Sequence, residues 1–276
     1  FQSRPFDLVS TTTTCEHCAA GCELRTDHRH YKVRRRLGGD RPEVNEEWNC
    51  DRGRFAFYYG RGDDRITRPL VREGGELRVA SWPEAIDAAV AGLKAAGSAA
   101  GVLTGGRLTL ENAYGYSKFA RAVLGTNNID FRSRVHSVEE ADFLAHAVAG
   151  KQVGDGVTYT ELGGAKKVVC VAFEPEEESP IVFLRLRKGV RKSGTKVTTI
   201  APYLSNGARK LGAELIATVP GREADALAGL ELDAETVLLV GERAAAVPGL
   251  LLAALDAAER SGARLAWIPR RAGDRG

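Results

Sequence analysis

The chain has 276 residues, of which 43% are hydrophobic and 27% are charged, and its net charge is +3. This composition is ordinary for a soluble globular protein, and so small a net charge gives no general argument for binding nucleic acid or an anionic membrane surface. No run approaches the roughly 18 consecutive apolar residues that span a bilayer, and no secretory signal pattern opens the chain. We therefore expect a soluble, cytoplasmic protein.

Short strands are predicted in the first 80 residues. The patterns at 22–28 and 31–37 indicate two strands, and residues 70–80 indicate a hairpin that turns at Gly74 and Gly75. The sequence contains no methionine and opens on Phe1, so we also expect it to be part of a longer polypeptide. Residues 1–80 are predicted to form a small β-rich module.

Four cysteines lie in this module, in the spacing C-x2-C-x3-C-x27-C: Cys15, Cys18, Cys22 and Cys50. Three thiolates within eight residues can hold one corner of an iron–sulfur cubane if the backbone turns tightly, which the small residues at 19–21 permit. Four cysteines also form tetrahedral zinc sites, although those usually carry two C-x2-C pairs. The spacing therefore favours a [4Fe-4S] cluster over zinc, and disulfides are disfavoured in a reducing compartment.

Several charged residues accompany the cysteines. Arg25, Arg52 and Arg54 are candidates for raising the potential of a negatively charged cluster, with solvated surface residues as the alternative. His17 is interpreted as a neighbour of the cluster and not a ligand, because the set of cysteines is already complete. The basic run at 32–36 favours a solvated or subunit-facing strand edge over a nucleic-acid surface.

From residue 81 the pattern alternates between helix and strand, which predicts a parallel sheet flanked by helices. Ser81 followed by Glu84 predicts a capped helix start. Strands are predicted at 100–104, 129–131, 166–173, 196–201, 214–219, 236–241 and 264–268, and helices at 81–94, 110–124, 138–148, 180–192, 222–230 and 250–260. The fold class is thus α/β, with residues 81–276 as a second domain that we expect to be incomplete at its C-terminal end.

Three features of this second domain could be read either as structural or as part of a metal or nucleotide site. Cys170 lies in an apolar run and is predicted to be a small buried thiol. The run at 176–178 is predicted to be a solvated acidic helix start and not a metal site. The loop at 105–107 follows a strand and could hold a phosphate, but a retained nucleotide is not favoured without a G-x-G-x-x-G pattern.

The chain resembles the molybdopterin oxidoreductase superfamily, which includes formate dehydrogenases, nitrate reductases and the large iron–sulfur subunit of respiratory complex I. The resemblance spans nearly the whole chain, and the cysteine module is its most specific part. The motifs that carry it are the four cysteines, Asn45, the runs at 50–55, 65–70 and 125–130, and the stretch 174–180, which stands where the family places a pterin loop.

The residues that would bind molybdenum depart from the catalytic members. Formate dehydrogenases carry their metal-binding cysteine or selenocysteine in Arg-Val-(Cys or Sec)-His-Gly, whereas residues 134–137 here are Arg-Val-His-Ser, so the ligand position is missing. Ser133 or Ser137 as an oxygen ligand is the alternative. Arg52 replaces a frequent lysine and is not an equivalent bridge to a pterin. We therefore expect no molybdopterin and no catalytic residue in this chain.

The segments at 11–17 and 45–50 resemble the large iron–sulfur subunits of bacterial complex I that retain an extra cluster. The resemblance implies part of an electron-transfer subunit of a proton-pumping NADH:quinone oxidoreductase, in which the four cysteines bind one [4Fe-4S] cluster off the main electron path. It also implies a [2Fe-2S] and further [4Fe-4S] clusters before Phe1, partner subunits of the peripheral arm, no nucleic acid, and a peripheral place on the cytoplasmic side of the inner membrane. The alternatives are a catalytic pterin-dependent oxidoreductase and a zinc-stabilised interaction module.

Overall fold

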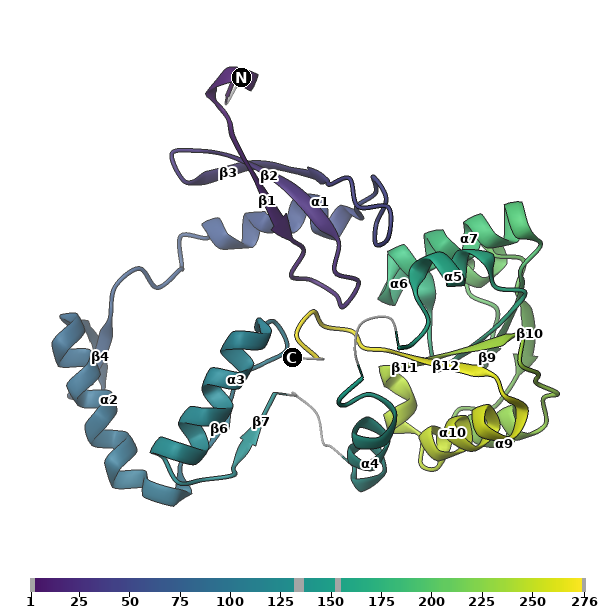
Figure 1. The fold of residues 1–276 in the computed structure, drawn as a ribbon. Coiled ribbons are helices and arrows are strands. Elements are labelled where there is room, and N and C mark those ends of the chain that lie inside the picture. The colour runs from purple at the N-terminus through teal and green to yellow at the C-terminus, as the bar shows by residue number, and fades with distance from the viewer. Residues whose placement is uncertain (1–2, 132–136, 152–154, 275–276) are drawn as a thin grey trace.

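The computed structural model describes residues 3–131, 137–151 and 155–274 (Figure 1). Along the chain it shows an antiparallel N-terminal module, a middle segment of hairpin and helices, and a parallel α/β layer. This arrangement confirms the predicted α/β class with a small β-rich module in front.

The N-terminal module is a three-stranded antiparallel sheet in the order β1-β2-β3. Its strands are β1 (Val9–Thr14), β2 (Glu23–Arg29) and β3 (Lys32–Gly38), preceded by a short 3-10 helix, η1 (Pro5–Asp7). The predicted strands at 22–28 and 31–37 are confirmed to within one residue. β1 was not predicted, although its run of threonines is typical of a strand. Helix α1 (Asp51–Phe55) contacts β3 and continues into the 3-10 helix η2 (Ala56–Arg61).

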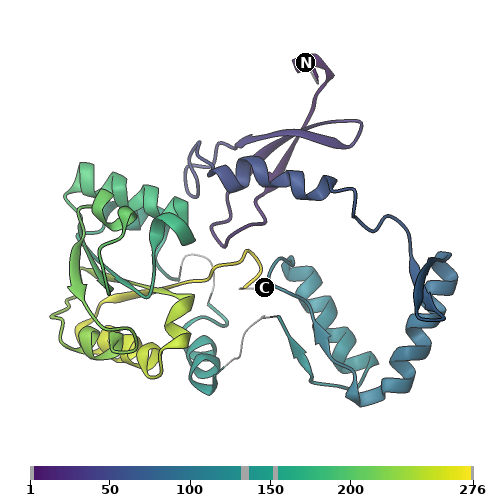
Figure 2. The ribbon, with the colours of Figure 1, turned by 180° about the vertical axis from the view of Figure 1, so that it is seen from behind.

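Residues 70–96 of the middle segment lie away from the other two parts, whereas the loop before residue 110 returns to the C-terminal residues, where the N–H of Gly273 donates to the carbonyl oxygen of Gly106 at 2.9 Å (Figures 1 and 2). The hairpin of β4 (Leu70–Glu73) and β5 (Glu76–Val79) contacts helix α2 (Trp82–Ala96). Ser81 caps α2 as predicted, since its hydroxyl accepts the N–H of Glu84 at 3.3 Å. The remaining elements are η3 (Gly97–Ala99), β6 (Val102–Leu103), α3 (Leu110–Lys118), a π-helical turn η4 (Phe119–Val123) and β7 (Ile129–Asp130). β6 pairs with β7 in parallel and is shorter than predicted.

The α/β layer is built on a five-stranded parallel sheet in the order β10-β9-β8-β11-β12. Its strands are β8 (Lys167–Val171), β9 (Lys196–Ala201), β10 (Glu214–Ala217), β11 (Thr236–Gly241) and β12 (Arg264–Ile268). The helices are α4 (Val138–Ala147), α5 (Tyr159–Gly164), α6 (Pro175–Glu178), α7 (Pro180–Ser193), α8 (Asn206–Lys210), α9 (Glu223–Ala228), η5 (Glu242–Ala246) and α10 (Leu250–Ser261). The strands and the longer helices match the predictions, and α6 covers the acidic run that was predicted to start a helix, whereas α5 and α8 were not predicted.

Both faces of this sheet are covered, which explains why consecutive residues inside β8 and β11 are apolar and buried. In β8, Val169 and Val171 belong to the core cluster that also holds side chains of α4, α9 and α10. Val168 and Cys170 point to the other face, toward α5 and α7. Cys170 is 1% exposed, and burial raises its pKa to about 12, so the predicted buried thiol is confirmed.

Within the described residues, no helix is both long enough and apolar enough to cross a membrane. The division of the chain at residue 80 stays a prediction. The β4–β5 hairpin, which that division assigns to the first domain, contacts α2 of the second.

Candidate metal centre

The first three cysteines lie on a closed turn between β1 and β2. The N–H of Cys15 donates to the carbonyl oxygen of Cys22 at 2.9 Å, which brings the two ends of the turn together. Gly21 has φ +72°, a left-handed conformation that glycine adopts without strain, so the tight turn expected from the small residues is present. Cys15 and Cys22 are 5% and 6% exposed, and Cys18 is half-buried.

Cys50 approaches this turn from the N-terminus of α1. It is the residue that caps the helix, and its Sγ accepts the N–H of Gly53 at 3.5 Å. Gly53 is buried, and a Cβ atom added to it would lie 3.4 Å from the Sγ of Cys15 and 4.0 Å from the Sγ of Cys50. A side chain at Gly53 would therefore contact both thiols at the wall of the cavity that Gly53 lines.

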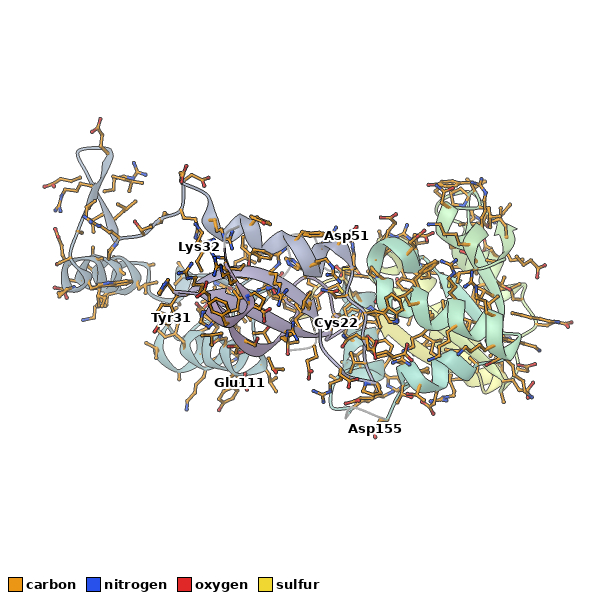
Figure 3. The ribbon with its side chains drawn as sticks, turned by 90° about the horizontal axis from the view of Figure 1, so that it is seen from above. Cys22, Tyr31, Lys32, Asp51, Glu111 and Asp155 are labelled. Carbon is orange, nitrogen blue, oxygen red and sulfur yellow. The ribbon has the colours of Figure 1, made fainter. Side chains whose placement is uncertain are left out.

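All four cysteines line one cavity of about 280 Å³. A single water needs roughly 10–15 Å³, so the space exceeds what one small ion requires. Cys22 and Asp51 lie on the side of the module that faces the α/β layer (Figure 3). The opposite wall comes from that layer, through the acidic residues 176–178 and through Pro180 and Ile181 at the start of α7. The cavity thus lies between the two parts of the chain.

Within the part of the chain that the structure describes, no group of three histidine, cysteine, aspartate or glutamate side chains converges as a single metal ion requires. A zinc ion would draw four sulfur atoms to about 2.3 Å from one point. Four cysteine thiolates are also the donor set of a [4Fe-4S] cluster, and the cavity that they line has room for a group larger than one ion.

Burial favours the protonated thiol at the three cysteines of the turn, Cys15, Cys18 and Cys22. Burial raises the pKa of Cys15 to about 11, and burial also raises the pKa values of Cys18 and Cys22. Metal ligation needs the thiolate, so iron binding at these residues would release protons.

Of the three arginines proposed to tune a cluster, Arg52 lines the cavity. Arg54 instead donates to the side-chain oxygen of Asn49 at 2.8 Å, and Asn49 also lines the cavity. Arg25 is paired with Asp27 at 3.4 Å on β2 and is absent from the cavity wall. The structure therefore brings Arg52 to the cavity and leaves Arg25 on the sheet.

His17 lines the cavity and is 7% exposed. Burial lowers its pKa, which favours a neutral imidazole, and its Nε2 lies 3.6 Å from Glu16. Glu16 accepts two hydrogen bonds of 3.0 Å from Arg36, and Arg35 pairs with Asp27. Two arginines of the basic run at 32–36 therefore form ion pairs with acidic residues of the same module.

The acidic run at 176–178 begins a helix as predicted, α6, and Glu177 is exposed, but Glu178 is not solvated. The run lines the cavity, and the side chain of Glu178 is 7% exposed and pairs with Arg243 at 2.8 Å. Glu176 pairs with Lys210. The sequence did not reveal this, because the arginine and the lysine come from segments 65 and 34 residues away.

The segment in which a molybdenum ligand was sought, including Ser133, lies outside the described residues. Ser137 is described, and its hydroxyl accepts the N–H of Glu140 at 3.0 Å as the cap of α4. The loop at 105–107 borders a second cavity of about 400 Å³, which Arg271 also lines. A Cβ atom at Gly106 would lie 2.3 Å from the Arg271 side chain, so the chain itself packs closely on this loop.

Comparison with known families places two matches along the chain. Residues 8–61 match the molybdopterin oxidoreductase Fe4S4 domain, and residues 65–251 match the molybdopterin oxidoreductase family. The first match contains all four cysteines, and the second covers more than half of the chain.

The relatives with high identity are G subunits of NADH-quinone oxidoreductase. The chain is 56% identical to the G subunit of Mycobacterium bovis and 54% identical to that of Streptomyces coelicolor, in each case over 100% of this chain and 36% of the relative. It is 34% identical to a G subunit of Rhizobium meliloti over 83% of this chain and 26% of the relative. The chain thus spans only about a third of the length of these curated relatives. It belongs to the molybdopterin oxidoreductase family, and within that family it resembles the G subunit of NADH-quinone oxidoreductase.

Proposed function

We propose that this chain binds one [4Fe-4S] cluster through Cys15, Cys18, Cys22 and Cys50, as part of an electron-transfer subunit of a proton-pumping NADH:quinone oxidoreductase. The observation that carries the proposal is the single cavity that all four cysteines line. The match of residues 8–61 to an Fe4S4 domain and the names of the relatives support it.

When bound, the cluster would supply a one-electron redox centre. The residues of this chain hold and shield it. Pro180 and Ile181 close the wall on the α/β side with apolar surface, and Ile181 is 3% exposed. Arg52 adds positive charge and residues 176–178 add negative charge, so the two walls act on the potential in opposite directions. In this proposal these residues position and surround the cluster and do not form or break covalent bonds of a substrate.

We assign residues 1–80 to the cluster module and 81–276 to a domain that docks partner subunits. Support comes from the apolar side chains that the middle segment leaves exposed. On α2, Trp82, Ile86 and Val90 are 70%, 54% and 42% exposed and stand on one face at a spacing of four residues. Exposed apolar surface of this kind marks a site of association. The partners would be the other subunits of the peripheral arm, on the cytoplasmic side of the inner membrane.

The further [2Fe-2S] and [4Fe-4S] centres implied by the resemblance would belong to parts of the subunit other than these residues. A catalytic pterin enzyme is the first alternative, and it would need a molybdenum or tungsten ligand from an unexpected residue. A zinc module is the second, in which the same four cysteines would hold a single zinc ion.

The test is elemental analysis for iron, zinc, molybdenum and tungsten on the subunit purified without oxygen, together with the electron paramagnetic resonance spectrum after reduction. About four irons per chain at this site, with neither molybdenum nor tungsten, supports the proposal. One zinc without iron would support the interaction module, and molybdenum or tungsten would support the catalytic alternative.

A further inference from the structure

Arg185 of α7 is a buried cation that bonds to the cysteine module. It is 6% exposed, and its guanidinium donates to the Glu46 carboxylate at 3.2 Å, to the carbonyl oxygen of Val44 at 2.9 Å and to that of Pro42. Burying an arginine is costly unless its donors are paired, and its planar fork can serve several acceptors at once. These three bonds compensate for the burial, and all of them go to the loop that leads to Cys50.

The loop that Arg185 holds is a tight turn. Arg41 and Glu46 exchange two backbone hydrogen bonds of 2.9 and 2.8 Å, which close residues 41–46 into a compact unit. Glu46 has φ +50°, a left-handed conformation that strains a non-glycine residue. Its carboxylate is also paired with Lys188 of α7. Two cations of one helix therefore stabilise a strained turn in the other part of the chain.

Asn45, inside this turn, connects the two segments that carry the cysteines. It is 1% exposed, and its side-chain oxygen accepts the N–H of Glu23 at 2.9 Å, while its amide donates to the carbonyl oxygens of Glu23 at 3.1 Å and Trp48 at 2.9 Å. Glu23 directly follows Cys22, and Trp48 stands two residues before Cys50. One buried side chain thus fixes the separation between the cysteine turn and the fourth cysteine.

We propose that Arg185 is a positioning residue for the cluster: it holds the 41–46 turn against α7 and so, through Asn45, sets where the Cys50 thiolate stands relative to the other three. The proposal rests on the proposed function, since it assumes that these cysteines hold a cluster. A [4Fe-4S] cluster needs four thiolates at fixed corners, and residues that orient metal ligands affect both affinity and potential. The α/β layer then takes part in cluster binding through this contact as well as through the cavity wall.

The experiment compares Arg185→Met with Arg191→Met in the subunit purified without oxygen. Methionine keeps a long apolar stem but removes every donor, and Arg191 is an exposed arginine on the same helix. The readouts are the rate of iron release to a chelator and the spectrum and midpoint potential of the reduced cluster. We expect Arg185→Met to release iron roughly 10- to 100-fold faster with a changed spectrum, as for other partners of metal ligands. Arg191→Met should match the wild type.

Two further variants keep the test decisive. If Arg185→Met fails to accumulate, Arg185→Lys replaces it, because lysine retains the charge for Glu46 but lacks the planar fork that reaches three acceptors. We expect an intermediate rate of iron release from it. Asn45→Ser should also accelerate release, and the Asn45→Ser/Arg185→Met double variant should be no faster than the faster single variant, because both act through one turn.

A wild-type subunit with four irons, beside Arg185 variants of unchanged release rate and spectrum, would overturn the positioning role and leave the proposed function intact. A double variant whose acceleration is the product of the two single effects would overturn the connection through Asn45. A wild-type subunit without iron would refute the proposed function itself, and this inference with it.

Discussion

The hydroxyl of Tyr159, in the first turn of α5, donates to the backbone carbonyl oxygen of Ala20 at 3.1 Å. Ala20 is 4% exposed and belongs to the turn that carries the first three cysteines. It shares a core cluster with Cys15, Cys22 and Ile181 of α7, and Tyr159 packs against that cluster. The cysteine turn therefore depends on the α/β layer for part of its core and for one of its hydrogen bonds.

Tyr159→Phe should loosen the cysteine turn while leaving the α/β layer folded. The Ala20 carbonyl would lose its donor, at a cost of about 1 kcal/mol. We expect faster release of iron to a chelator, with an unchanged circular dichroism spectrum. Tyr116→Phe, at a 46% exposed tyrosine of α3, is the matched control and should behave as the wild type. Equal release rates for the two variants would show that the hydrogen bond does not support the site.

Cys22→Ala should abolish the cluster signal and lower the iron content, because three thiolates leave one corner of the cubane without its ligand. Cys170→Ala is the control, since it removes an equally buried thiol from the interior of the α/β sheet. We expect it to retain the iron of the wild type. Iron content and the reduced spectrum, measured on protein purified without oxygen, decide the prediction. Retention of four irons by Cys22→Ala would contradict it.

Gly53→Ala tests whether the space between the thiols is needed. Alanine favours helix over glycine by up to about 1 kcal/mol, so the metal-free protein should not be destabilised. The added methyl would stand 3.4 Å from the Cys15 Sγ, inside the space that a cluster requires, so we expect iron binding to fall sharply. Gly60→Ala in η2 is the control, because a Cβ atom there meets nothing within 4 Å. Thermal unfolding and iron content separate the two effects.

Asp27→Asn should destabilise the module at neutral pH by about 2 kcal/mol, because a buried carboxylate loses charge-assisted hydrogen bonds. Asp27 is 1% exposed and accepts from Ser10 at 2.7 Å and from Arg35 at 2.5 Å. Burial by itself would raise the pKa of Asp27, but these hydrogen bonds outweigh it, and the pKa lies below its ordinary value of 3.8.

The stabilisation by Asp27 is therefore complete above its ordinary pKa and is lost as the pH falls below about 4, toward the lower pKa of the folded state. Denaturant unfolding between pH 7 and pH 3 should show the difference between wild type and Asp27→Asn shrinking in acid. Asp40→Asn, at an exposed aspartate, should show no such trend. A difference that stays constant with pH would contradict the assignment.

Ile86→Arg should weaken assembly of the subunit with its partners without unfolding this chain. Ile86 is 54% exposed at the centre of the apolar face of α2, and α2 contributes no buried residue to the core of this chain. A charge placed in an apolar interface is costly, so we expect loss of the subunit from the purified complex. Ala88→Arg, two residues along the helix and so on its opposite side, is the control. Equal assembly of both variants would place the interface elsewhere.

The strands and longer helices of the α/β layer could be predicted from the local pattern of apolar and polar residues. Runs such as Val168–Val169–Cys170–Val171 are apolar at every position because both faces of a parallel sheet are covered, and that regularity is visible in the sequence. The cysteine spacing was equally local, since three of the four candidate ligands fall within one turn of the chain. The short helices α5 and α8 were missed because they are too brief to show a helical period.

The sequence by itself determined the fold class, the set of four candidate ligands and the likeness to a family of iron–sulfur proteins. Only the tertiary structure decided which residues surround those ligands. Glu178, Ile181 and Arg185 belong to the α/β layer, more than 120 residues from Cys50, and no periodicity or spacing relates them to it. These contacts form only when the cysteine module packs against the α/β layer. Their contribution to stability therefore depends on burial in the folded chain and not on the local propensity of either segment.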